Sequence, residues 1–234
     1  MRQYCLKLLY CALAALTLSA DAYAALRVAV ASNFVPVLEA LIIEIPPPSE
    51  ITIISGATGA LTNQILLGAP FDVLLAADAE RPTKLAKLKT LANPACYARG
   101  QLVLSGAKAI SDLKAGGRIA IANPQTAPYG RAAAEVLQRI NEPSLQIIQG
   151  NNAQQAYQFK ASGNVDFALV PDSLAEGFRI PTTWHSPIEQ FAISVRPPGH
   201  PKHMESEAFL LWLLGEQVQS RLNHYGYSRC NHDF

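Results

Sequence analysis

The sequence has little charge, few cysteines and none of the short motifs that mark common enzymes. Only 16% of its 234 residues are charged and 50% are hydrophobic, which excludes a disordered polyelectrolyte. The 19 basic and 18 acidic residues nearly cancel, so we expect no nucleic-acid partner. The absence of G-x-x-x-x-G-K-[ST] and G-x-S-x-G motifs excludes a P-loop and a hydrolase nucleophile elbow of those types. A medium-sized globular protein of one or two domains remains.

The histidines form no metal-binding motif. All five lie beyond residue 184, and Pro201 separates His200 from His203. A zinc protease instead carries two histidines four residues apart on one helix. We therefore expect no direct metal ligands.

The N-terminus has the layout of a secretory signal peptide. Arg2 and Lys7 precede an uncharged apolar run over 8–18, and a small-x-small site ends at Ala24. An uncleaved membrane anchor is the alternative. However, the run of about 11 residues is shorter than the ~20 that span a bilayer. The sequence therefore predicts export and cleavage after Ala24.

Cleavage changes the composition of the working protein. The mature chain has 210 residues, with 17 basic and 17 acidic side chains. Two of the four cysteines leave with the signal, so Cys96 and Cys230 remain. An oxidising compartment favours a disulfide between them, although two buried free thiols are also compatible with the sequence.

Strand-like and helix-like segments alternate along the mature chain, which is typical of parallel sheets with helices on both faces. There are too many strands for one small sheet, so we expect two α/β lobes joined by crossing strands near 102–104 and 192–195. Strands are predicted over 26–31, 51–54, 71–76, 101–104, 118–122, 145–148, 165–170 and 191–195. Helices are predicted over 34–45, 60–67, 81–91, 111–115, 129–140, 153–161 and 205–222.

Four junctions share one pattern, in which an apolar strand ends in small polar residues and a helix starts at once. They lie at 31–33, 55–59, 127–130 and 150–153. Ligands bind at the carboxyl ends of parallel strands, and free N–H groups at helix starts attract anions. Ordinary helix capping would produce the same residues. No cation lies within the junctions except Arg131, so hydroxyl and N–H donors would have to hold any anion there.

Asp72 and Asp78 flank the end of one predicted strand, and this pair of carboxylates is compatible with an enzyme. A secreted α/β hydrolase or transferase could use either carboxylate. No nucleophile and base accompany them, so surface or supporting roles are favoured.

The ordered motifs of this chain resemble the periplasmic molybdate-binding proteins of ABC importers. The likeness runs from about residue 26 to 195. It is carried by VAVASNF (28–34), SGATG (55–59), GAPFDV (68–73), AAD (76–78), YARG (97–100), IANP (121–124) and APYGRAA (127–133).

The resemblance implies a two-lobed, type 2 periplasmic-binding-protein fold, each lobe a mainly parallel sheet with helices on both faces. The implied lobes are 25–103 with 193–234, and 104–192. It implies a monomeric periplasmic protein that captures molybdate, and tungstate as well, for an ABC permease. No catalysis and no cofactor are expected. The alternatives are a receptor for another small oxyanion or organic anion, and the secreted hydrolase.

The resemblance also implies which residues bind the anion. By motif these are Ser32, Asn33, Ser55, Tyr129 with Ala127 nearby, and Ala153. All of them would bind the oxygen atoms of the oxyanion. Some members place a tyrosine hydroxyl after the strand over 165–170, where this chain has Ser173. Whether Ser173 takes that place is left open.

Overall fold

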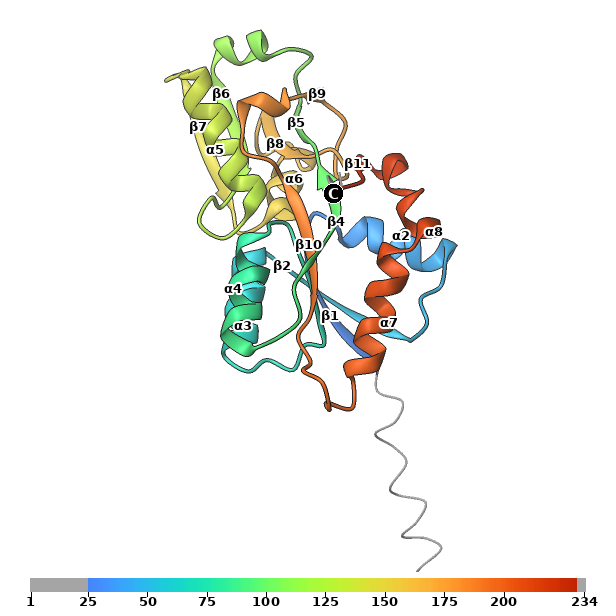
Figure 1. The fold of residues 1–234 in the computed structure, drawn as a ribbon. Coiled ribbons are helices and arrows are strands. Elements are labelled where there is room, and N and C mark those ends of the chain that lie inside the picture. The colour runs from blue at the N-terminus through green and yellow to red at the C-terminus, as the bar shows by residue number, and fades with distance from the viewer. Residues whose placement is uncertain (1–24, 231–234) are drawn as a thin grey trace, which may run out of the picture.

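The chain folds into two α/β lobes, each built around one β-sheet (Figure 1). The computed structural model describes residues 25–230, so the predicted signal peptide over 1–24 lies outside the described residues. Within 25–230, no helix combines the length and the apolar character that crossing a membrane requires.

A six-stranded sheet forms the centre of lobe 1, with strand order β11-β4-β10-β3-β1-β2. β1 pairs in parallel with β2 and β3, whereas β10 is antiparallel to β3 and β4, and β11 is antiparallel to β4. The strands are β1 Leu26–Ala31, β2 Ile51–Gly56, β3 Val73–Ala76, β4 Ala95–Gly100, β10 Glu189–Ser194 and β11 Tyr227–Ser228.

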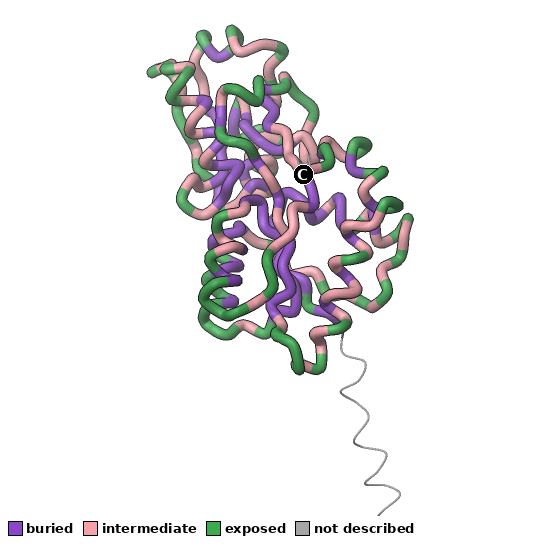
Figure 2. Tube along the Cα trace, viewed as in Figure 1, coloured by how far each residue is buried: buried purple, intermediate pink, exposed green. Residues whose placement is uncertain are grey.

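Helices cover both faces of this sheet because its central strands carry apolar side chains on both. Val28 and Val30 of β1 pack with α2, α7 and α8, whereas Ala29 packs with α3 and α4 on the opposite face. The buried strands run between these helix layers in Figure 2. The helices are α2 Val35–Glu44, α3 Thr58–Leu66, α4 Glu80–Lys89, α7 His203–Leu214, α8 Glu216–Gln219 and the 3₁₀ helix η4 Leu222–Tyr225.

A five-stranded sheet of order β7-β6-β8-β5-β9 forms lobe 2. β6 is parallel to β7 and β8, and β5 is antiparallel to β8 and β9. α5 packs with Ile119 and Ile121 of β6, and α6 packs with Ala120 on the other face. The elements are β5 Leu102–Ser105, η2 Ile110–Ala115, β6 Gly117–Ala122, α5 Pro128–Ile140, β7 Leu145–Gly150, α6 Ala153–Ala161, β8 Phe167–Pro171, β9 Phe178–Arg179 and η3 Thr182–Trp184.

The chain passes between the two sheets twice. β4 ends at Gly100 in lobe 1 and β5 starts at Leu102 in lobe 2, and the chain returns between η3 and β10. β4 and β10 are neighbours in one sheet, so the two passages lie side by side. The lobe boundaries proposed from the sequence stay a prediction.

The predicted α/β architecture of two lobes is confirmed, with departures in single elements. β4, β9 and β11 were not predicted, because β9 and β11 have only two residues each and β4 lacks an apolar alternation. The helix predicted over 205–222 is divided at Gly215, whose extended backbone ends α7 and caps α8. The first turn of α3 starts at Thr58 rather than at Ala60, which matters for the site.

Candidate functional site

All four predicted junctions meet at one small cavity between the lobes. β1 and β2 of lobe 1 and β6 and β7 of lobe 2 each place a carboxyl end there, as ligand sites in α/β sheets require. The cavity has about 180 Å³ of free space, part of it open to solvent. Its lining residues are Ala31, Ser32, Asn33, Gly56, Ala57, Thr58, Ala127, Pro128, Tyr129 and Ala153, and none of them is charged.

Two hydroxyl groups in the lining have a proton to donate. Ser32 is buried, and within residues 25–230 its hydroxyl has no hydrogen-bond partner. The Thr58 hydroxyl oxygen accepts from the Ala77 N–H at 3.0 Å, which fixes the side chain. Because a hydroxyl has one donor and two acceptor positions, Thr58 still has its own proton available.

Main-chain N–H groups supply the other donors. Tyr129 and Ala153 lie in the first turns of α5 and α6, where N–H groups have no partner within the helix. Asn152 caps α6 through Gln155 N–H and so leaves the Ala153 N–H uncapped. In the turn after β1, no described group accepts from the Asn33 N–H. These helix starts and N–H groups favour an anion.

A glycine allows α5 to start this close to β6. A Cβ at Gly130 would lie 2.3 Å from the Ala122 carbonyl oxygen, which is backbone and cannot move aside cheaply. Gly130 therefore sets the position of the first turn of α5, and with it the Tyr129 N–H.

The structure places four of the five predicted site residues in the lining and leaves one outside. Ser32, Asn33, Tyr129 and Ala153 come together, but Ser55 is exposed on the edge strand β2. Ser55 was assigned by motif and stays a prediction, although its side chain lies outside the lining. The hydroxyl on the first helical residue, Thr58, occupies the cavity instead.

The side chain of Asn33 is engaged within the protein. Its side-chain Nδ2 donates to Gln190 Oε1 and to the Tyr227 hydroxyl, both at 2.9 Å. Both side-chain N–H groups are therefore engaged in the protein, and the donor that remains for a ligand is the main-chain N–H.

Behind the cavity lies a buried polar network that sequence reasoning missed. Gln190, which is 0% exposed, accepts from Asn33 and from the Tyr97 hydroxyl at 3.1 Å, and donates to the Tyr129 hydroxyl at 3.3 Å. Burial, and secondarily the neighbouring Tyr227 phenol, raises the pKa of both Tyr97 and Tyr129 well above its ordinary value. Burial also raises the pKa of Tyr227. The three hydroxyls therefore stay protonated around neutral pH.

Ser173, left open by the sequence, does not line the cavity. Its hydroxyl donates to the Asn33 carbonyl at 2.9 Å and lies 3.1 Å from the Tyr227 hydroxyl. Ser173 follows β8 in lobe 2, whereas Asn33 and Tyr227 belong to lobe 1, so this contact joins the lobes.

A second set of bonds joins the lobes on the α3–α4 side, and we call these the rim contacts. They link the segment over 59–81 of lobe 1 to the segment over 125–131 of lobe 2. The Gly59 N–H donates to the Thr126 carbonyl at 2.9 Å, Arg81 Nη2 to the Gln125 carbonyl at 2.8 Å, and Arg131 Nη1 to Glu80 Oε2 at 3.2 Å. The lobes are thus in contact around the cavity.

A larger hollow of about 1220 Å³, partly open to solvent, includes Tyr227 in its wall, but both of its arginines are already paired with carboxylates. Arg99 pairs with Glu189 and Arg179 with Asp172, each at 2.7 Å. This hollow therefore suits a small anion less well than the neutral cavity does.

The two carboxylates of the enzyme alternative are engaged in structural contacts. Asp72 pairs with Arg196 at 2.6 Å and accepts from the Arg27 N–H at 2.7 Å. Asp78 accepts from the Arg81 N–H at 2.9 Å and pairs with the Arg81 guanidinium. Neither residue lines the cavity.

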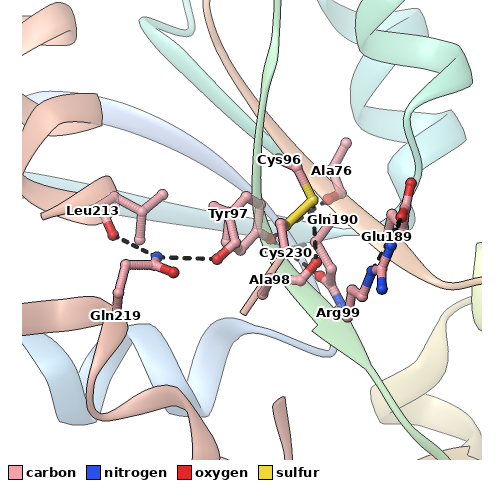
Figure 3. Close-up of a disulfide and its surroundings, with 10 residues drawn as sticks. All are labelled: Ala76, Cys96, Tyr97, Ala98, Arg99, Glu189, Gln190, Leu213, Gln219 and Cys230. Atoms are coloured by element: carbon pink, nitrogen blue, oxygen red, sulfur yellow. Dashed lines mark hydrogen bonds and ion pairs between the residues drawn. A yellow bond between two sulfur atoms is a disulfide. The ribbon is translucent and has the colours of Figure 1, made fainter. Parts of the chain in front are cut away.

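A disulfide joins Cys96 of β4 to Cys230, the pairing that the sequence left open (Figure 3). Nearby, Gln219 Nε2 donates to the Tyr97 carbonyl at 3.0 Å and to the Leu213 carbonyl at 2.9 Å. The C-terminal segment is thus attached to β4 at several points.

Comparison with known proteins places these features in context. The family described as bacterial extracellular solute-binding protein matches residues 26–228. The molybdate-binding protein ModA of Azotobacter vinelandii is 33% identical, over 96% of this chain and 98% of that protein. The ModA of Rhodobacter capsulatus is 34% identical, over 76% of this chain and 77% of that protein.

A solved structure resembles the whole fold. The periplasmic molybdate-binding protein of Azotobacter vinelandii superposes with a TM-score of 0.78 at 28% identity, covering 88% of this chain and 100% of that one. This likeness confirms the predicted two-lobed periplasmic-binding-protein fold.

Proposed function

This chain belongs to the bacterial extracellular solute-binding proteins, and from that premise we propose that it captures molybdate in the cavity between its lobes. Both ModA relatives are named as molybdate-binding proteins. The observation that carries the proposal is the cavity itself, which is small, uncharged and surrounded by hydrogen-bond donors.

The proposed ligand set supplies donors from both lobes to a tetrahedral dianion. Ser32 and Thr58 donate through hydroxyls, with Thr58 replacing the Ser55 of the sequence prediction. Asn33, Tyr129 and Ala153 donate through main-chain N–H groups. Burying a dianion is costly unless its oxygens are hydrogen-bonded, and charged acceptors strengthen each bond. Aimed N–H and O–H groups meet that need without a counter-ion.

Closure of the lobes is part of the proposed mechanism. The anion binds first to one lobe, and rotation at the two side-by-side passages brings the other lobe onto it. Closing excludes water and strengthens each donor bond to the anion. The rim contacts and the Ser173 contact then hold the closed form.

The proposed cellular role follows from the family and from the predicted signal. We propose a monomeric protein of the periplasm that delivers its anion to the membrane permease of an ABC importer and catalyses no reaction. Tungstate has the charge and shape of molybdate, so it is proposed as a second ligand. No resident cofactor is needed, because the anion is the cargo.

Calorimetric titration of the mature protein, residues 25–234, against sodium molybdate, tungstate, sulfate and phosphate tests the proposal. We expect one-to-one binding of molybdate and tungstate. Phosphate should bind far more weakly, because near neutral pH it carries a proton that needs an acceptor. Sulfate should also bind more weakly, because it is too small to reach all the donors at once. No heat with any of the four, or equal affinity for sulfate, contradicts the proposal.

A further inference from the structure

Tyr227 lies on a very short strand at the edge of the lobe 1 sheet. β11 has only two residues, and it pairs with β4 through Tyr227 opposite Gly100 and Ser228 opposite Arg99. Two residues of pairing hold a chain segment weakly. The disulfide from Cys230 to Cys96 adds a covalent attachment to the same strand three residues later. The cysteine pair therefore helps to keep Tyr227 next to β4.

The Tyr227 hydroxyl bonds to both ends of Asn33. It accepts from Asn33 Nδ2 at 2.9 Å and donates to the Asn33 carbonyl at 3.0 Å. The Tyr227 ring packs edge-on against Phe34, with ring centroids 5.3 Å apart. Tyr227 thus fixes the turn after β1 that presents the Ser32 hydroxyl and the Asn33 N–H to the cavity.

Lobe 2 reaches the same carbonyl. Ser173 donates to the Asn33 carbonyl at 2.9 Å, and its hydroxyl lies 3.1 Å from that of Tyr227. A carbonyl oxygen has two lone pairs, so Tyr227 and Ser173 together saturate it. If the lobes open, the Ser173 hydroxyl leaves the Asn33 carbonyl, whereas the Tyr227 hydroxyl stays bonded to it.

We propose that Tyr227 is a positioning residue, held by the Cys96–Cys230 disulfide, that couples lobe closure to the anion-binding turn through Asn33. The inference rests on the proposed function, because the turn must bind the anion for the coupling to matter. Tyr227 does not touch the anion. Its hydroxyl orders the turn after β1, and in the closed form the Ser173 hydroxyl meets both that hydroxyl and the Asn33 carbonyl. Tyr227 should therefore slow the release of the anion more than it speeds capture.

Tyr227→Phe tests the inference, since it keeps the ring and removes the hydroxyl. Stopped-flow release of molybdate should become about three- to tenfold faster, the change expected for one lost hydrogen bond. Association should change little. Ser228→Ala, on the same strand but exposed, is the matched control and should release molybdate at the wild-type rate.

Ser173→Ala repeats the test from the other lobe and serves even if Tyr227→Phe folds poorly. Ser173→Ala should also speed molybdate release. In the variant that carries both Tyr227→Phe and Ser173→Ala, the loss of free energy that holds the anion should be smaller than the sum of the two single losses. Fully additive losses would refute the coupling. A merely structural role for Tyr227 would lower the apo melting temperature and leave the release rate unchanged.

The disulfide is tested by the double variant Cys96→Ala with Cys230→Ala. This variant should also release molybdate faster than the wild type. Tyr227→Phe should then raise the release rate less in the cysteine variant than it does in the wild-type protein. Wild-type release from the cysteine variant would refute the role of the disulfide. If the wild-type protein does not bind molybdate, the proposed function and this inference both fail. If it binds and Tyr227→Phe releases at the same rate, only the inference fails.

Discussion

Replacing Thr58 with valine separates the ligand role of its hydroxyl from its structural role. Valine keeps the shape of threonine and removes one O–H group. In the structure that oxygen accepts from the Ala77 N–H at 3.0 Å, and its proton is free for the anion. The substitution should therefore weaken both binding and folding.

The two losses can be given magnitudes. A hydrogen bond to a charged group contributes about 1.5–3 kcal/mol, so the Kd for molybdate should rise by about ten- to a hundredfold. The buried Ala77 N–H loses its acceptor, which costs about 1–3 kcal/mol of stability. For a chain of this size that corresponds to a fall in apo melting temperature of about 2–12 °C.

Two further serine variants make the comparison decisive. Ser32→Ala should weaken molybdate binding by a similar factor without the loss of apo stability, because the Ser32 hydroxyl has no partner among the described residues. Ser55→Ala should leave both quantities unchanged, because Ser55 is exposed and outside the cavity. Calorimetry and thermal melting of all three proteins measure this. A large affinity loss in Ser55→Ala with none in Thr58→Val would refute the reasoning.

Three other predictions concern the rim contacts, the start of α5 and the buried tyrosines. Arg81→Gln removes the bond to the Gln125 carbonyl and should speed molybdate release by about two- to tenfold, whereas an unchanged rate would show that this rim contact does not hold closure. Gly130→Ala forces a Cβ against the Ala122 carbonyl and should cost about 1–3 kcal/mol of stability and weaken binding, which urea unfolding and calorimetry would show. The raised pKa values of the buried tyrosines mean that above about pH 10 the unfolded chain loses protons that the folded chain keeps. Stability should therefore fall as the pH rises past about 10, and denaturant midpoints that stay flat from about pH 9 to 11 would contradict the network.

Much of the fold could be predicted because its signals are local. The strand over 26–31 is an apolar run ended by Ser32, and Pro128 starts α5 where its missing N–H costs nothing. The same local signals predicted the junctions that contain Tyr129 and Ala153, whereas their roles as ligands came from the resemblance. β4 and β11 could not be predicted, since their pairing depends on strands distant in sequence and on the disulfide.

Two features of the site could not be predicted from the sequence, for physical reasons. Thr58 was not singled out, because the helix was expected to begin at Ala60 and Thr58 was therefore assigned to the turn before it. The side-chain contacts of Asn33 could not be predicted because its partners, Gln190 and Tyr227, lie 157 and 194 residues away in the sequence. Such a network forms only once the lobes have folded, so no local sequence pattern predicts it.

The location of the bound anion tests the central claim most directly. Crystals grown with sodium molybdate, measured on both sides of the molybdenum absorption edge, give an anomalous difference map that marks the metal alone. We expect one strong peak in the cavity between the Ser32 and Thr58 hydroxyls and the Tyr129 and Ala153 N–H groups. A peak in the hollow beside Arg99 instead, or no peak from protein saturated with molybdate, would contradict the account.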